Sequence, residues 1–308
     1  MEKQRPIFIF SHPRTRSNLL AHILATHPDI GDVIIYPFRA ANSAGPERRL
    51  PNGSIFATKE VAVRDTFQRC YEELQGKLKE TQDRGFIPLI KDHIFNSLST
   101  SVIDSQFPGS MNDVHPVISG NTPGGPNPTV LPDTFLANIT PIIVIRHPTT
   151  MVASTAKVML REFGADRDDP GISLSCTYKW SRVLFDFFRG AGQVVGVVDG
   201  DEMVNDTEGV MIKLCGLIGV DGSLIQYEWK PKALCTPMNE EMNEHVYLKA
   251  LYESTGIIRD KQKIEPLVLE DEVQKWTVEW GEDMADRLKG FVEDAMADYD
   301  YLFQFRLQ

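Results

Sequence analysis

The chain has 308 residues, of which 42% are hydrophobic and 24% are charged. This balance is typical of a globular protein and excludes the disordered and fibrous classes. The formal net charge of −11 would repel a polyanion, so we expect no nucleic-acid partner, and any anion site must be a local cluster of basic side chains. The four cysteines lie far apart without a Cys-x-x-Cys pair, which indicates a reducing, cytoplasmic environment and no metal site.

The first element of the chain is an apolar run at residues 7–10. A run of this length is too short for a signal peptide or a membrane span, so we expect no membrane association. A short apolar run between Pro6 and a polar turn is typical of a strand buried on both faces. Residues 18–25 follow with leucines and an isoleucine at helical spacing. The chain therefore begins with a strand, a polar turn and a helix.

The later segments continue this alternation of strands and helices. Further strands are predicted at 88–93, 139–145 and 194–198, of which 139–145 gives the strongest signal for a buried strand. Loops are expected at 39–58 and 97–138, and helices at 59–84, after Pro148, and at 173–189, 210–219 and 270–299. Strands that alternate with helices predict an α/β fold in which a parallel sheet is flanked by helices.

We expect a single domain over residues 1–308. It would carry an irregular insertion on the substrate side near 97–138, rich in Gly, Pro, Ser and Asn, because loops of this length are usually functional when they are ordered. Its C-terminal part, residues 240–308, is expected to be helical. In a parallel sheet, ligands bind beyond the carboxyl ends of the strands, where polar and basic residues gather in this sequence.

A polar segment connects the first strand to the first helix. The free N–H groups at a helix N-terminus favour an anion, and the segment adds five donor side chains at the same place: Arg14, Thr15, Arg16, Ser17 and Asn18. It is not a Walker motif, because neither glycine nor lysine lies between Phe10 and Asn18. The alternative explanation is a solvated turn in which Ser17 or Asn18 only caps the helix.

With this loop the sequence resembles the sulfotransferase superfamily. Its members hold the 5′-phosphosulfate of 3′-phosphoadenosine 5′-phosphosulfate (PAPS) on a loop of the type xKxGTTW or xRSGSS. Arg14 matches the basic residue of that loop, and Thr15, Ser17 and Asn18 fall at its hydroxyl-bearing positions. The chain departs from the pattern because it lacks the loop glycine and adds Arg16. The resemblance implies a P-loop NTPase-like sulfotransferase fold.

Two further motifs match the superfamily. Arg146 ends a strand and is followed eight residues later by Ser154, a pair that the resemblance assigns to the 3′-phosphate, for which a guanidinium is well suited. The sequence Lys91-Asp92-His93 reproduces a Lys-x-His motif, in which the resemblance implies a general base for His93 and a contact with the transferring group for Lys91. Lys91 and Arg14 would stabilise the charge that develops on the sulfuryl and phosphate oxygens.

The resemblance thus implies an enzyme, a PAPS-dependent sulfotransferase that needs no metal and acts on a hydroxyl or amine of a small-molecule acceptor. The implied catalytic residues are His93, Lys91 and Arg14, and the implied cofactor-binding residues are Arg14, Thr15, Arg16, Ser17, Asn18, Arg146 and Ser154. Two alternatives stay open. One is a degenerate protein that binds the product nucleotide PAP without turnover; the other is a P-loop kinase-like phosphotransferase, which would require a Walker lysine and a magnesium-binding hydroxyl.

The acceptor pocket is expected to be formed by the loops at 36–58 and 97–138. Its polar candidates are Arg39, Arg48, Arg49 and His115. Loops vary independently of the fold, so the sequence leaves the acceptor open. It also leaves open whether the protein forms a homodimer.

Overall fold

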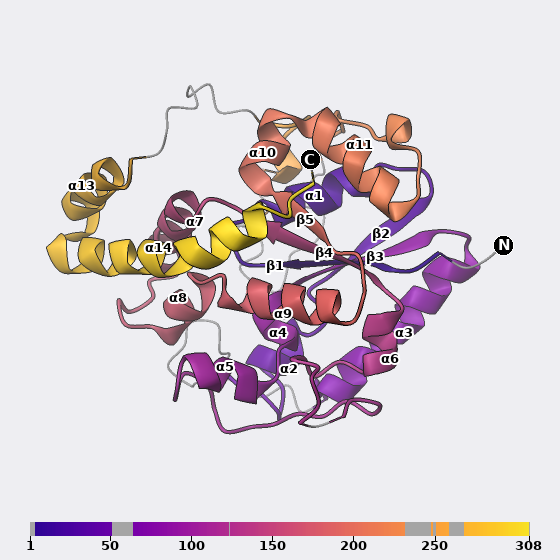
Figure 1. The fold of residues 1–308 in the computed structure, drawn as a ribbon, viewed down its shortest axis with the longest axis horizontal. Helices are drawn as coiled ribbons and strands as arrows, with labels where there is room; N and C mark the ends of the chain where they lie inside the picture. Colours follow the sequence, from indigo (N-terminus) through magenta and orange to yellow (C-terminus); the bar gives the residue numbers. More distant parts are fainter. Residues whose placement is uncertain are drawn as a thin grey trace.

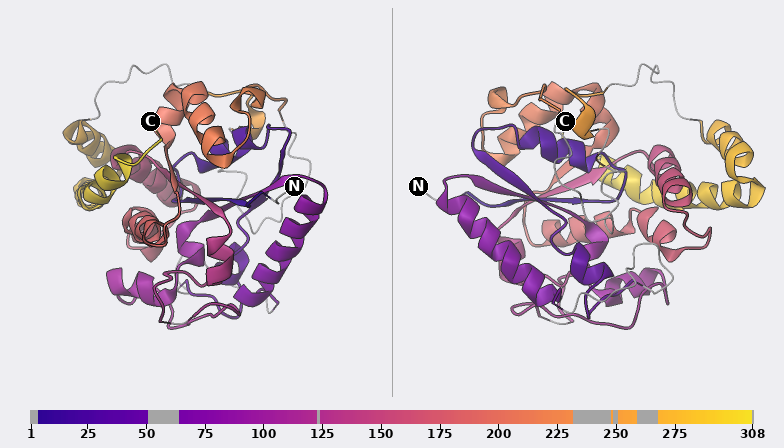
Figure 2. Two further views of the ribbon diagram at one scale, coloured as in Figure 1. Left: turned by 45° about the vertical axis from the view of Figure 1, so that its right-hand side comes forward. Right: turned by 180° about the vertical axis from the view of Figure 1, so that it is seen from behind.

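A computed structural model describes residues 4–50, 64–122, 124–231, 248, 251–258 and 268–307. In this part of the chain, helices cover both faces of one central sheet (Figure 1, Figure 2). Parts of the predicted 39–58 loop, the start of the 59–84 helix and parts of the 240–308 segment lie outside the described residues. No described helix is both long enough and apolar enough to cross a membrane.

Five strands form one parallel sheet in the order β2-β3-β1-β4-β5. Their bounds are β1 Ile7–Ser11, β2 Ile30–Ile35, β3 Ile87–His93, β4 Thr140–Ile145 and β5 Gly196–Asp199. The predicted α/β fold with a parallel sheet flanked by helices is confirmed. The sequence analysis missed β2, which lies at one edge of the sheet.

The helices before the middle of the chain are α1 (Ser17–Leu24), α2 (Arg39–Ser43), α3 (Phe67–Asp83), α4 (Ile94–Ser97), α5 (Thr100–Gln106) and α6 (Asp133–Ala137). Those after it are α7 (Pro148–Ala156), a π-helical turn (Lys157–Glu162), α8 (Pro170–Ser175), α9 (Lys179–Gly190), α10 (Gly200–Asn205), α11 (Thr207–Ile218), a 3₁₀ turn (Gly222–Leu224), α13 (Leu269–Trp280) and α14 (Glu282–Phe303).

Two predicted helices are interrupted. The helix expected at 173–189 is divided into α8 and α9, and the Thr177 hydroxyl accepts a hydrogen bond from the Lys179 N–H at the start of α9. The helix expected at 270–299 is divided at Gly281, whose φ of 87° lies in the left-handed region that favours glycine. Apolar periodicity continued across both breaks, so it could not reveal them.

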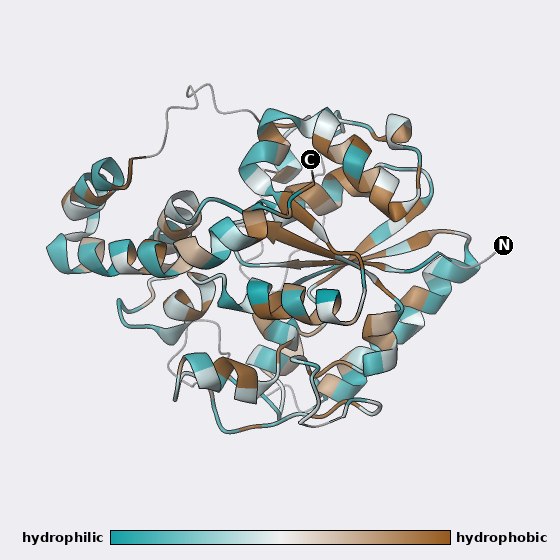
Figure 3. Ribbon diagram, in the orientation of Figure 1, coloured by the Kyte–Doolittle hydropathy of each residue, from teal (hydrophilic) through white to brown (hydrophobic). Residues whose placement is uncertain are grey.

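The strands separate two hydrophobic cores. Phe8 and Phe10 point to the side covered by α3, α6, α7, α9 and α14, whereas Ile7 and Ile9 point to the side covered by α1, α10 and α11. All four side chains are fully buried, as expected for a central parallel strand. Apolar residues accordingly concentrate in the strands and on the inward sides of the helices (Figure 3).

The C-terminal helix is attached to the end of β5. The Tyr299 hydroxyl donates to the Asp199 carboxylate at 3.1 Å, and the Leu307 N–H donates to the Val197 carbonyl at 2.9 Å. The other oxygen of Asp199 accepts from the N–H groups of Asp201 and Glu202, and so caps α10. The last helix therefore stabilises the turn at the carboxyl end of β5.

The turn between β5 and α10 packs against the loop that follows β1. A Cβ added at Gly200 would lie 2.3 Å from the carbonyl oxygen of Thr15. We expect Gly200→Ala to displace that loop and to lower the free energy of unfolding by about 1–3 kcal/mol, the usual effect of overpacking. Urea denaturation measures the change.

The matched control is Gly216→Ala in α11, where an added Cβ meets no atom within 4 Å. It should raise the free energy of unfolding by about 0.5–1 kcal/mol, because alanine favours a helix over glycine. A Gly200→Ala protein as stable as the wild type would show that the two loops do not pack closely.

Candidate functional site

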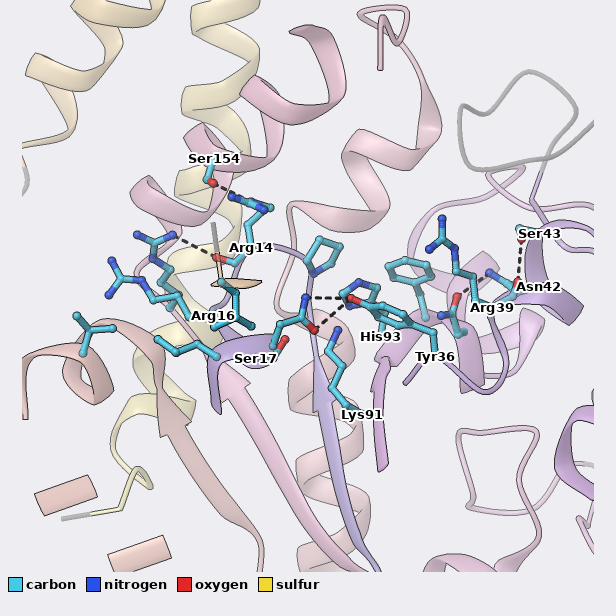
Figure 4. Close-up of a pocket in the computed structure, with 18 of the residues that line it drawn as sticks. Arg14, Arg16, Ser17, Tyr36, Arg39, Asn42, Ser43, Lys91, His93 and Ser154 are labelled. Atoms are coloured by element: carbon cyan, nitrogen blue, oxygen red, sulfur yellow. Dashed lines mark hydrogen bonds between the residues drawn. The ribbon is translucent and has the colours of Figure 1, made fainter. Parts of the chain in front are cut away.

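A cavity of about 470 Å³ lies at the carboxyl edge of the sheet. Its walls come from the loop after β1, the segment 36–50 after β2, the ends of β3 and β4, and residues 251–258. Figure 4 shows the side chains of the first of these segments facing those of Lys91 and His93. The register explains the position, because Ser11 at the end of β1 lies opposite His93 on β3 and Val144 on β4. Three polar strand ends thus meet at one place, as the sequence predicted.

The cavity is basic although the protein is acidic overall. Five cationic side chains line it: Arg14, Arg16, Arg39, Lys91 and Arg146. No carboxylate is among the described residues that line it. With a net charge of −11 over the chain, this local excess of positive charge is suited to an anionic ligand.

The loop after β1 has an unusual backbone. Arg14 and Arg16 adopt φ values of 64° and 65°, a region in which a side chain costs roughly 1–2 kcal/mol and which glycine enters freely. Arg16 therefore takes the left-handed conformation without the glycine of the family loop. The N-cap of α1 is Arg16, whose side chain makes no capping hydrogen bond; the alternative in which Ser17 or Asn18 only caps the helix stays open.

Two arginines share one carboxylate behind this loop. Arg146 Nε and Arg16 Nη2 lie 2.9 Å and 3.1 Å from Asp201 Oδ1, and Arg146 Nη1 donates to the Arg14 carbonyl at 3.2 Å. Arg14 Nε donates to Ser154 Oγ at 2.9 Å. One negative charge between two guanidinium groups leaves net positive charge at this end of the cavity.

Lys91 and Tyr36 stand at the middle of the cavity. Lys91 is fully buried, and its Nζ lies 3.9 Å from the centre of the Tyr36 ring, a distance at which the ring stabilises a cation. The Tyr36 N–H donates to the Lys91 carbonyl at 2.8 Å, and its hydroxyl contacts the Asn18 amide. Tyr36 falls in the loop 36–58 that was expected to form the acceptor pocket, but the sequence did not single it out, because β2, the strand that ends just before it, was missed.

His93 presents a neutral imidazole beside them. Its Nδ1 lies 3.3 Å from the carbonyl oxygen of Ser11; since a carbonyl only accepts, Nδ1 carries the proton and Nε2 keeps a lone pair. Burial lowers the pKa of His93 well below its ordinary value of 6.5, and the charge of Lys91 lowers it further. At neutral pH this side chain can accept a proton.

A buried polar chain fixes the segment that carries His93. Asp92 accepts from the N–H groups of His93 (2.7 Å) and Phe38 (3.1 Å) and from the Asn96 side chain (2.7 Å). The pKa of Asp92 is raised to about 6 by burial, and these hydrogen bonds act in the opposite direction. Asn96 also accepts from the Asn42 amide at 3.1 Å. Asp92 thus holds the end of β3 against the chain after β2.

Arg49 completes this network and does not line the cavity. Its side chain is fully buried, its Nε donates to Asn42 at 2.9 Å, and its other nitrogens donate to the carbonyls of Phe95, Asn96 and Leu98. Burial lowers its pKa to about 9, so it remains charged at neutral pH. Arg49 supports α4, and its predicted place in the acceptor pocket is wrong.

All but one of the residues predicted for the donor site line this cavity. Those that line the cavity are Arg14, Arg16, Ser17, Asn18, Lys91, His93, Arg146 and Ser154. The Thr15 hydroxyl instead donates to the His12 carbonyl within the loop at 2.9 Å, and the Thr15 side chain is buried. Their roles stay predictions.

Of the predicted acceptor candidates, only Arg39 lines the cavity. His115 is paired with Asp113 at 2.8 Å on an exposed surface. No described residue of 97–138 lines the cavity, so the assignment of this insertion to the substrate side, within one domain, stays a prediction. The described residues also contain no group of three or more His, Cys, Asp or Glu side chains placed to hold a metal ion.

The fold and the cavity define an α/β protein with a basic pocket at the carboxyl edge of a parallel sheet. No protein-family model matches the chain. It is 30% identical over 328 residues to the sulfotransferase ppzF of Metarhizium rileyi (strain RCEF 4871), an alignment that covers 98% of this chain and 96% of that protein. The sulfotransferase ppzF of Metarhizium majus (strain ARSEF 297) is 30% identical over 329 residues with the same coverage.

The chain therefore belongs to the sulfotransferase family, and the family suggested by the sequence motifs is confirmed. Among solved structures, the mouse sulfotransferase SULT7A1 in complex with PAP is similar over 93% of this chain and 88% of that chain, with a TM-score of 0.41 and 12% identity.

We expect His93 to titrate well below pH 6.5, because burial and Lys91 both disfavour its charged form. NMR of isotope-labelled protein should show the neutral tautomer protonated at Nδ1 throughout the neutral range. Lys91→Met should raise the pKa of His93 by removing the neighbouring positive charge. A wild-type midpoint at or above 6.5, or a lower midpoint in Lys91→Met, would contradict this electrostatic description.

Proposed function

We propose that this protein transfers the sulfuryl group of PAPS to a hydroxyl or amine of a small-molecule acceptor. Membership of the sulfotransferase family gives the type of reaction; the donor and the acceptor class are the proposal. The observation that carries it is the arrangement of one continuous cavity. Arginines and Ser154 stand at one end, and the neutral imidazole of His93 stands beside buried Lys91 at the middle.

The arginine end is suited to the two charged ends of the donor. Arg146, with Ser154 nearby, would bind the 3′-phosphate, and Arg16 would add a second guanidinium there. Arg16 and Arg146 pair with the single carboxylate of Asp201, so their combined charge stays positive, and this supports the assignment. The N–H groups at the start of α1, with Ser17 and Asn18 beside them, would bind the 5′-phosphosulfate.

His93 and Lys91 would act on the transferring group. As the acceptor oxygen or nitrogen forms its bond to sulfur, its proton passes to His93 Nε2, and the bond between sulfur and the 5′-phosphate oxygen breaks to release PAP. Lys91 and Arg14 would stabilise the charge that moves onto the phosphate oxygen. We also propose a cytoplasmic location, supported by three described cysteines that are free and buried: Cys70, Cys176 and Cys215.

The donor assignment predicts a preference for PAP over AMP, which lacks the 3′-phosphate. Arg146→Ala should weaken PAP binding roughly 30-fold or more, since loss of a buried charged partner typically costs about 2–5 kcal/mol. AMP binding, already poor, should barely change. Calorimetric titration of both nucleotides measures this, with Arg84→Ala at an exposed position outside the cavity as the control. Equal weakening of PAP and AMP, or tighter binding of ATP with magnesium, would favour the kinase-like alternative.

The proposed base predicts a loss of turnover without a loss of nucleotide affinity. Mass spectrometry of a metabolite panel incubated with PAPS identifies a working acceptor. On that acceptor, His93→Ala should lower kcat by about 10²- to 10⁴-fold, the usual effect of losing a general base, while PAP affinity stays nearly unchanged. Turnover near the wild-type level in His93→Ala would remove His93 from the mechanism, and PAP binding without turnover of any acceptor would favour the degenerate binding protein.

A further inference from the structure

The turn after β5 places acidic residues close to the basic end of the cavity. They are Asp199, Asp201 and Glu202, and none of them lines the cavity. Negative charge near an anion site weakens binding by repulsion, and the proposed donor carries a phosphate and a phosphosulfate. The contacts of each carboxylate therefore decide whether this acidic turn opposes the site or supports it.

Two of these carboxylates are used away from the cavity. One oxygen of Asp199 accepts from the N–H groups of Asp201 and Glu202 and so caps α10. Its other oxygen accepts from the Tyr299 hydroxyl on the last helix. Glu202 pairs with Arg306 near the C-terminus at 3.0 Å. Asp199 and Glu202 thus hold α10 and the end of the described chain in place.

Asp201 is the member of this turn that contacts the arginines of the cavity. Its Oδ1 lies 2.9 Å from Arg146 Nε and 3.1 Å from Arg16 Nη2, and its Oδ2 lies 3.2 Å from the hydroxyl oxygen of Thr150. These partners belong to the end of β4, the loop after β1 and the first turn of α7. One carboxylate therefore joins three segments behind the basic end, where Figure 4 shows Arg16.

The Arg146 guanidinium is held in one direction by these contacts. Its Nε bonds to Asp201, and its Nη1 donates to the Arg14 carbonyl at 3.2 Å. The Tyr178 hydroxyl holds the backbone of the same residue, because it accepts from the Arg146 N–H at 2.8 Å and donates to the Arg146 carbonyl at 2.6 Å. Nη2 makes no hydrogen bond to any described residue. The outer end of the guanidinium is thus left for a ligand in the cavity.

We propose that Asp201 is a positioning residue, which holds Arg146 and Arg16 in the orientation that binds the 3′-phosphate of the donor. This inference rests on the proposed function. An arginine side chain has several rotatable bonds, and fixing them before the ligand arrives removes an entropy cost from binding. The shared carboxylate also offsets the repulsion between the two guanidinium groups. Selectivity for PAP over AMP then depends on a residue that does not touch the nucleotide.

The sign of the effect distinguishes positioning from competition. If Asp201 only competed with the phosphate for the arginines, its removal would strengthen PAP binding. We expect the opposite: in calorimetric titrations, Asp201→Ala should weaken PAP binding roughly 10- to 100-fold, the effect of a lost charge-assisted contact. Asp201→Asn keeps the size of the side chain and an accepting oxygen, so it should fold normally and weaken PAP binding less. AMP binding should barely change in either variant.

A double-mutant cycle assigns the effect to the guanidinium that Asp201 holds. In an Arg146→Ala background, Asp201→Ala should weaken PAP binding much less than in the wild type, because the group that it positions is gone. A general loss of stability would weaken binding equally in both backgrounds. Glu202→Gln is the matched control: it removes one negative charge from the same turn, but from a residue that pairs with Arg306. It should bind PAP as the wild type does.

The outcomes separate this inference from the function on which it rests. A wild-type protein that does not prefer PAP to AMP would contradict the proposed donor. A wild-type preference for PAP, together with equal or tighter PAP binding in both Asp201 variants, would overturn the positioning role alone. Equal weakening of PAP and AMP, additive losses in the cycle, or a loss in Glu202→Gln as large as in Asp201→Asn would also overturn it.

Discussion

Strand β1 can contribute functional groups only beyond its carboxyl end, because its apolar side chains are buried on both faces of the sheet. Its two neighbours run parallel to it, so their polar ends are forced to the same edge. This constraint positions the loop after β1, the Lys91 to His93 segment and Arg146 around one cavity. No pair of these segments is adjacent in the sequence, and the parallel pairing of β1 with β3 and β4 brings them together.

A carboxylate behind the cavity holds two of the arginines that give it positive charge. Arg16 occupies a backbone conformation that costs roughly 1–2 kcal/mol for a residue with a side chain, and its pairing with Asp201 at 3.1 Å acts against that cost. Asp201 lies in the first turn of α10, where the helix dipole favours an acidic residue. The same carboxylate orients Arg146. The acidic turn after β5 is therefore part of the site, although it does not line the cavity.

The sequence predicted what depends on local pattern and missed what depends on distant partners. Continuous apolar runs revealed β1, β3, β4 and β5, and the motifs at their ends identified Arg14, His93 and Arg146. Strand β2 was missed because Gly31 and Asp32 interrupt its apolar pattern and because it lies at a sheet edge, where burial is partial. Arg49 was misassigned for a related reason: a sequence marks an arginine as polar, but only tertiary structure shows that buried carbonyl groups surround it.

The attachment of α14 to the end of β5 affects the order in which the molecule can be completed. Tyr299 and Leu307 bond to Asp199 and Val197, about a hundred residues earlier in the chain. During synthesis on the ribosome the sheet can form as soon as β5 has emerged, whereas the turn that carries Asp201 receives these contacts only after residues 299–307 have emerged as well. The basic end of the cavity is thus completed after the sheet, and a nascent chain would hold a finished sheet before it held a finished binding site.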